Sequence, residues 1–314
     1  MTRIEIRPAA AGDVRRVLRN TLAMPGQTLA ELESQVTLFL QYAREMALDP
    51  TQSWWCIREG HELCACTCVT SPGRTAMILL PAGPVHMAEE HSLCEMVNHV
   101  VAAASQDVCL VQCLVAPTDE KNSSALCRAG FMPVAELIYM ERGHDAAGLL
   151  SVGAVDRSAW QWTSYSPENH ADFCHLIAAT YVGSRDCPRL TGLRDMEDIM
   201  EGHKAAGRFA PHRWRMLLCK GEPMGCILLA ENPLRPVMEI SYMGVHPAYR
   251  GRGLGRVILA EGLEIAHRER ITRVTLAVDC KNEPAVNVYQ TNGFRETMRR
   301  VALVRSCSPN HASA

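Results

Sequence analysis

The chain has 314 residues, of which 47% are hydrophobic and 21% are charged. This balance is typical of a globular protein and excludes a mostly disordered or collagen-like chain, while the length favours two domains over one. The formal charge of −2 gives no overall attraction to nucleic acid or to an anionic membrane, so we expect neither as a partner.

The first half of the chain alternates between strand and helix patterns. Period-two alternation predicts a strand at 3–7, and an apolar face predicts helices near 14–18, 28–48 and 93–104. Apolar runs predict further strands, and a short helix at 123–129 ends at Gly130. These strand runs are 54–57, 64–69, 76–80, 108–115 and 134–140.

The second half repeats this order after a segment rich in Gly, Ala and Ser. The predicted strands are 160–165, 214–219, 225–231, 237–245, 273–279 and 298–304, and the predicted helices are 172–181, 190–207, 254–268 and 285–291. Two copies of one α/β unit explain this repetition better than one large domain. We therefore expect domains at 1–145 and 159–306, a linker at 146–158 and a flexible tail at 307–314.

A loop that alternates Gly and Arg connects the strand at 237–245 to the following helix. Such a loop lets anionic oxygens approach backbone amides at a helix N-terminus, which predicts a phosphate or pyrophosphate ligand. The strict alternation at Gly251, Gly253 and Gly255 does not fit the Rossmann spacing, and the Lys-Ser/Thr of a Walker loop is missing.

The segment RGRGLG at 250–255, after Gly-Val-His-Pro, resembles the acyl-CoA pyrophosphate loop of the GNAT acetyltransferase superfamily. A second family element, from Asn282 to Gly293 and Phe294, follows at the right distance. The resemblance implies an α/β fold of two tandem GNAT-like domains, each a mixed, mostly antiparallel sheet flanked by helices. It implies acetyl-CoA as co-substrate and an amine as acceptor.

The resemblance also assigns roles to individual positions. The acyl carbonyl would lie on the amides of Met243, Gly244 and Val245, and Asn282 would contact pantetheine or its neighbouring loop. The pyrophosphate would lie on the amides of Arg250, Gly251, Arg252, Gly253, Leu254 and Gly255.

Acetyl transfer to an amine also requires two proton movements. Tyr289 matches the family's general acid, although it could instead be an aromatic residue that packs beneath the sheet. Glu239 lies 11 positions before Arg250 and is the candidate base; alternatively it pairs with an arginine at the strand end. If Glu239 is not the base, a water chain or His246 could accept the proton.

The acceptor is predicted less sharply. The polar segment at 181–194 would cover the acceptor site, where Asp186 or Glu197 could hold an amine. Arg194, Arg185 or Arg189 could hold an acidic group. The alternative is a solvated loop. Asp186 and Arg194 are the candidates that we carry forward.

The first repeat lacks the features that carry the chemistry. When Gly130 is aligned with Gly293, the tyrosine position becomes Leu126, and residues 80–87 have one glycine and no arginine. We expect this copy to keep the fold without catalysis, as in tandem proteins such as mycothiol synthase, whose layout is similar.

No metal site is predicted. Cys64, Cys66 and Cys68 have the period-two spacing of packed strand residues, and the 12 histidines show no HxH or HExxH spacing. The absence of an export signal and of a long apolar run, with 14 scattered cysteines, predicts a cytoplasmic protein with reduced thiols.

The leading hypothesis is therefore an acyl-CoA-dependent N-acyltransferase with its active site in the second domain and acetyl as the expected group. Two alternatives stay open. One is a non-catalytic acyl-CoA sensor or scaffold, and the other is an enzyme that acetylates protein amines. The sequence leaves the acceptor, the acyl length and the oligomeric state undecided.

Overall fold

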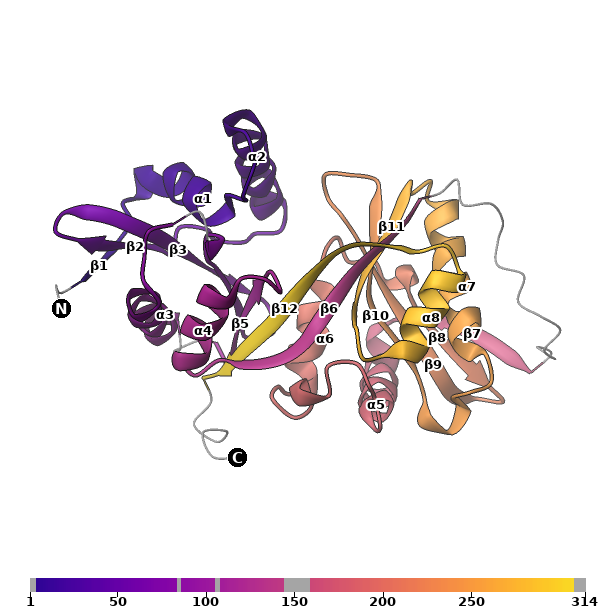
Figure 1. Ribbon diagram of the computed structural model, residues 1–314. Helices are drawn as coiled ribbons and strands as arrows, with labels where there is room; N and C mark the ends of the chain where they lie inside the picture. Colours follow the sequence, from indigo (N-terminus) through magenta and orange to yellow (C-terminus); the bar gives the residue numbers. More distant parts are fainter. Residues whose placement is uncertain (1–3, 84–85, 105–107, 144–158, 308–314) are drawn as a thin grey trace. The chain divides into compact units, whose positions relative to one another are not determined.

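The computed structural model describes residues 4–83, 86–104, 108–143 and 159–307 (Figure 1). The chain divides into two compact units, Met1–Glu136 with Arg300–Ala314 and Leu137–Arg299. No helix within the described residues is long and apolar enough to cross a membrane. The predicted linker at 146–158 lies outside the described residues, as does the predicted tail except for Cys307.

The first unit is a mixed sheet with helices. Its strand order is β1-β2-β3-β4-β5-β12, in which only the β4–β5 pair is parallel. The strands are β1 (Glu5–Pro8), β2 (Ser53–Arg58), β3 (His61–Ser71), β4 (Thr75–Leu79), β5 (Leu110–Val115) and the end of β12 (Arg295–Ser306). The helices are α1 (Val14–Leu22), α2 (Leu29–Glu45), α3 (Glu90–Ala104) and α4 (Glu120–Arg128).

The second unit has the corresponding layout, with strand order β6-β11-β10-β9-β8-β7 and one parallel pair, β10–β11. The strands are β6 (Met132–Gly143), β7 (Trp160–Ser164), β8 (Trp214–Cys219), β9 (Glu222–Glu231), β10 (Val237–Val245) and β11 (Arg273–Asp279). The helices are α5 (His170–Tyr181), α6 (Met196–Lys204), α7 (Leu254–Arg268) and α8 (Glu283–Thr291). The predicted fold class is confirmed.

Local sequence explains several of these elements. Thr28 and Glu31 form a reciprocal capping box that starts α2. Cys64, Cys66 and Cys68 all point into the apolar core of the first unit, which confirms that they pack as small hydrophobic residues.

In the second unit, the two faces of the sheet have separate cores. Met238 and Ile240 of β10 pack with apolar residues of α7, whereas Phe173 of α5 and Met200 of α6 pack on the other side with Trp214. Helices on both faces leave the strands buried, and this fixes β10 and β11 in place beneath α7 and α8.

The boundary predicted from composition differs from the units of the structure. Residues 137–143 of β6 pair with β11 in the second unit, and residues 301–306 of β12 pair with β5 in the first. The strands β6 and β12 occupy equivalent positions of the two repeats, since they begin at Met132 and Arg295, 163 residues apart. Each unit therefore contains most of the last strand of the other repeat, and the first unit consists of two separate stretches of chain.

Candidate active site

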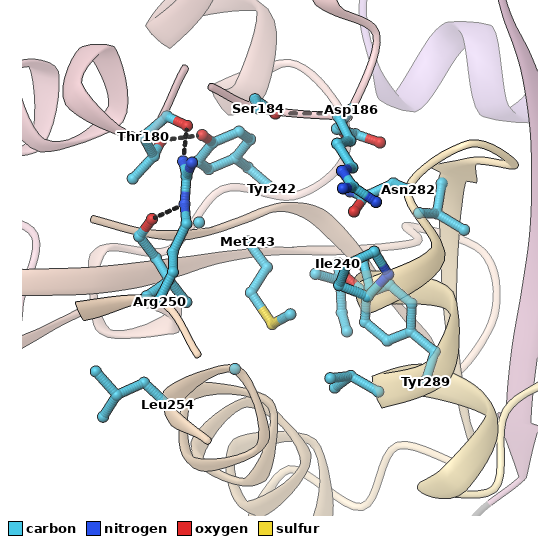
Figure 2. Close-up of a pocket in the computed structure, with 18 of the residues that line it drawn as sticks. Thr180, Ser184, Asp186, Ile240, Tyr242, Met243, Arg250, Leu254, Asn282 and Tyr289 are labelled. Atoms are coloured by element: carbon cyan, nitrogen blue, oxygen red, sulfur yellow. Dashed lines mark hydrogen bonds between the residues drawn. The ribbon is translucent and has the colours of Figure 1, made fainter. Parts of the chain in front are cut away.

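A cavity of about 570 Å³ in the second unit occupies the gap where β10 leaves β11. The two strands pair only at 237–239 and 273–275, after which β10 continues beside β9 with a register shift between Ile240 and Tyr242. Residues 240–245 and 276–278 line the two sides of the gap (Figure 2). Parallel strands that separate leave backbone groups without partners on the open side. Met243, Gly244 and Val245 lie on this stretch and pair with β9 on the other side, and their contact with an acyl group stays a prediction.

The loop at 250–255 forms the end of this cavity. Gly251 and Gly253 have φ angles of +75° and +77°, a region that glycine adopts without strain. A Cβ at either position would meet no described atom within 4 Å, so the backbone is open on this side. Gly253 is the N-cap of α7, and no described side chain caps this helix. The first-turn amides of Leu254 and Gly255 are thus available to an anion, whereas that of Arg256 donates to the Gly253 carbonyl.

The guanidinium groups of the loop's two arginines both have other partners. Arg250 donates from Nη2 to the Thr180 carbonyl at 2.6 Å, from Nη1 to that of Val182 at 2.8 Å and from Nε to that of Val245 at 3.1 Å (Figure 2). Arg252 is not part of the cavity lining, and its Cζ lies 5.7 Å from the centre of the Tyr249 ring. Both were predicted to bind through their backbone amides, but the Arg250 amide donates to the Pro247 carbonyl at 3.3 Å.

The predicted acid is at the opposite end of the cavity. Tyr289 of α8 is buried, lines the cavity and packs against Phe294 with ring centroids 5.7 Å apart. Burial, and to a lesser extent the charge of Asp186, raises the pKa of Tyr289, so the phenol stays protonated at neutral pH. Asn282, the N-cap residue of α8, lines the same end (Figure 2).

Asp186 also lines the cavity, but its carboxylate already has a partner. Its Oδ1 accepts the backbone N–H of Asp279 at 3.0 Å, and Asp279 Oδ2 accepts the N–H of Cys187 at 3.2 Å. Burial raises the pKa of Asp186, and the hydrogen bonds from Asp279 and Asn282 oppose this rise. The paired aspartates fasten the loop after α5 to the end of β11, and a direct contact of Asp186 with substrate stays a prediction.

Glu239, the predicted base, lies on β10 immediately before the strands separate. Its neighbours Met238 and Ile240 face the α7 core, so strand alternation directs Glu239 to the face that carries α5 and α6. It keeps access to solvent, yet the surrounding protein raises the pKa of its carboxyl through desolvation. No ion pair or hydrogen bond to a described residue is recorded for its side chain, which does not support the alternative of a strand-end salt bridge.

The other proton acceptor considered, His246, has a local role. Its Nδ1 accepts the N–H of Ala248 at 3.3 Å, and its ring packs against that of Tyr249 at 5.7 Å. This contact caps the bend before the loop.

Sequence reasoning missed an aromatic wall beside the cavity. The Tyr242 ring lies 6.0 Å from that of Tyr181 and 5.4 Å from that of His203, and the Tyr242 hydroxyl hydrogen-bonds Thr180 Oγ1. Burial raises the pKa of Tyr181 to about 12 and lowers that of His203 to about 4, and the charge of Arg194 opposes the first shift and adds to the second. Arg194, a predicted substrate residue, lies outside the cavity lining.

In the first repeat, described residues after β4 lie at the position that corresponds to the Asn282 end of the cavity. After β4, the Pro81 carbonyl accepts from Asn122 Nδ2 at 2.8 Å, and the Gly83 N–H donates to Asp119 at 3.0 Å. Asp119 is the equivalent of Asn282 at the repeat offset of 163. The segment after β4 thus crosses the N-terminus of α4, where the second unit has its cavity.

Comparison with known proteins agrees with this geometry. Residues 174–294 match the model of the acetyltransferase (GNAT) family. This part of the second unit therefore belongs to the GNAT family. Membership implies the use of acetyl-CoA, and the matched residues contain β10, the loop, α7 and α8.

Among curated relatives, the mycothiol acetyltransferase of Kineococcus radiotolerans is 33% identical over 183 residues, which are 56% of each chain. The stretches matched in three such enzymes span 23%, 26% and 56% of their lengths, so the chain matches at most about half of these relatives.

Solved structures support the fold of the whole chain. A GCN5-related N-acetyltransferase from Sphaerobacter thermophilus aligns over 98% of this chain and 96% of its own, at 13% identity and a TM-score of 0.62. A tandem GNAT protein from the clavulanic acid biosynthesis pathway aligns over 98% and 99%, at 16% identity and a TM-score of 0.54. This chain therefore has the tandem GNAT layout.

Proposed function

We propose that this protein transfers an acetyl group from acetyl-CoA directly to an amine, in the cavity of the second unit. The observation that carries the proposal is the gap between β10 and β11, which ends on one side at the uncapped N-terminus of α7. A pyrophosphate on the loop amides would direct the pantetheine arm along the gap past Asn282. The thioester would then lie beside Met243, Gly244 and Val245.

The proposed reaction proceeds in a ternary complex. Glu239, directly or through water, accepts a proton from the substrate ammonium, and the free amine attacks the thioester carbonyl. The backbone amides at 243–245 stabilise the resulting oxyanion. When the C–S bond breaks, Tyr289 donates its proton to the leaving thiolate to give CoA, and the attacking nitrogen loses its second proton to water to give the neutral amide. Tyr289 then regains a proton from solvent.

For the acceptor we propose a primary amine that docks against the aromatic wall of Tyr181, Tyr242 and His203. The relatives include both mycothiol acetyltransferases and, at 31% identity over 75 residues, N-alpha-acetyltransferase 30 of Saccharomyces cerevisiae. Small molecules and peptide N-termini are therefore both candidate acceptors. We also propose a reducing, cytoplasmic location, which the 14 free cysteines support.

Calorimetric titration with acetyl-CoA tests the cofactor site. Gly253→Glu places a carboxylate in the open space at the N-terminus of α7 and should abolish binding. Arg252→Glu makes a larger charge change in the same loop, but on a side chain outside the cavity lining, and should weaken binding much less. If the native chain binds no acyl-CoA, or if both variants lose binding equally, the proposed cofactor site is wrong.

Turnover is measured separately by CoA release with a panel of amines and with peptides that have free N-termini. Acceleration by a small amine or by a peptide identifies the acceptor class. Acetyl-CoA binding without release on any member would instead favour the acyl-CoA sensor.

A further inference from the structure

Three side chains with metal-binding atoms converge between the first turn of α5 and the start of α6. His170 Nε2 lies 3.1 Å from each carboxylate oxygen of Glu197 and 3.4 Å from the Sγ of Cys174. A ligand atom from each of the three residues lies within 4.8 Å of the other two. None of these residues lines the cavity of the proposed active site.

Hydrogen bonding alone accounts poorly for this convergence. A ring nitrogen has either one proton or one lone pair, so His170 Nε2 cannot satisfy a thiol and two carboxylate oxygens at once. In a tetrahedral zinc site with bonds of about 2.0–2.3 Å, neighbouring ligand atoms lie roughly 3.3–3.7 Å apart. The two separations from His170 Nε2 are close to those edges, and the third is within 4.8 Å, so one small cation could contact all three groups after an adjustment of the side chains.

The other nitrogen of His170 is held as in a metal-binding histidine. The Tyr165 hydroxyl hydrogen-bonds Nδ1 at 2.9 Å, and Tyr165 is buried among Phe173, Phe209 and Trp214. An outer partner of this kind fixes the ring orientation and directs Nε2 at the ion.

We propose that His170, Cys174 and Glu197 form a binding site for a divalent transition-metal ion, with Zn²⁺ as the best fit. One sulfur, one nitrogen and one oxygen ligand suit Zn²⁺ better than the hard cations Mg²⁺ and Ca²⁺, which prefer oxygen alone. Glu197 is largely exposed, so a fourth position is open to water. The spacing rules applied to the sequence missed this site because its third ligand comes from the next helix.

The position of this site suggests what the ion does. It would join α5 to α6 at their N-terminal turns, and the segment between these helices contributes residues 183–186 to the cavity lining. The bound ion would stabilise the folded state, and this stabilisation grows with the logarithm of the ratio of ion concentration to dissociation constant. It would thereby hold this wall of the cavity without taking part in acyl transfer.

The test uses the full chain, stripped with a chelator and titrated with Co²⁺ and then with Zn²⁺. One equivalent of Co²⁺ should give thiolate-to-metal charge-transfer absorption in the near ultraviolet, and Zn²⁺ should displace it. Zn²⁺ should also raise the melting temperature. These readouts do not depend on acetyl-CoA, so they test the metal site independently of the proposed acetyltransferase activity.

Three variants and one control locate the ligands. Cys174→Ser should abolish the charge-transfer band, and Glu197→Ala, at an exposed side chain, should weaken binding by about tenfold or more. Tyr165→Phe keeps the aromatic packing and should weaken binding by about 10–100-fold. Cys127→Ser removes an exposed thiol in the first unit and should change nothing.

The proposal is overturned if the native chain binds no metal at micromolar concentration. It is equally overturned if Cys174→Ser keeps the band, or if Glu197→Ala and Tyr165→Phe bind as tightly as the native chain.

Discussion

Replacing Tyr289 by phenylalanine isolates its hydroxyl from its packing. The ring is 6% exposed and contacts Phe294, and phenylalanine keeps both features, so stability should change by less than about 1.5 kcal/mol. Loss of a general acid typically lowers kcat by about 10²–10⁴-fold. This loss corresponds to roughly 2.7–5.4 kcal/mol on the barrier, because each tenfold change in rate is about 1.36 kcal/mol.

The assay is CoA release under saturating acetyl-CoA, with kcat and KM determined separately. The matched control is Tyr249→Phe, which also removes a hydroxyl from a residue of the cavity lining. Its kcat should stay within about threefold of the native value, whereas loss of an acid should lower kcat by about 10²-fold or more. An acetyl thioester whose thiol has a low pKa needs no acid, so the variant should recover most of its rate with that donor. A fall in kcat of less than about tenfold with acetyl-CoA, or an equal fall with both donors, would refute the acid role.

The remaining predictions concern the base, the acyl position and the loop. Glu239→Gln should lower kcat/KM by about 10²–10⁴-fold and remove the ascending limb of the pH profile, which lies above the ordinary glutamate pKa because desolvation raises it. An unchanged ascending limb of the pH profile would exclude Glu239 as the base. Because the pKa is raised in the folded state, ionisation of Glu239 lowers stability as the pH rises through that pKa, so the Gln variant should be at least as stable as the native chain at neutral pH. Gly244→Ala puts a Cβ 2.9–3.0 Å from the Thr180 side chain, so it should raise KM for acetyl-CoA and lower Tm. Thr180→Ala should partly restore both values. A normal KM and Tm in Gly244→Ala would show that β10 can shift freely. Arg250→Gln should raise KM for the acceptor more than Kd for acetyl-CoA, because it frees the carbonyls of Thr180 and Val182. A selective, salt-dependent loss of acetyl-CoA affinity would instead show that the guanidinium binds phosphate.

The sequence predicted those parts of the site that depend on local chain geometry. Alternating glycines before a helix require a particular backbone, so the loop at 250–255 and its positive φ angles were accessible from spacing. The resemblance to the GNAT superfamily, through the position of the strand before this loop, pointed to Met243, Gly244 and Val245. Both features are set by residues a few positions apart.

Contacts between distant residues were not accessible in this way. An aspartate in a polar loop can bind an amine or a backbone amide, and the choice for Asp186 depends on Asp279, 93 residues away. The same holds for Arg250, whose side chain is bound by carbonyls at the end of α5 instead of pointing into the cavity. The residue type determines which hydrogen bonds and ion pairs a side chain can form, and the fold determines with which partner it forms them.

The strand exchange shows why composition misplaced the domain boundary. A segment rich in Gly, Ala and Ser marks where the chain is free of regular pattern, but it does not tell which sheet the preceding strand joins. The strands β6 and β12 occupy equivalent positions of the two repeats, and a period-two pattern alone does not tell whether a strand joins β5 or β11. The registers are also equivalent, with Gly143 opposite Arg273 and Ser306 opposite Leu110 at the same offset of 163. The exchange is therefore a property of the three-dimensional arrangement, in which each unit contains most of the last strand of the other repeat.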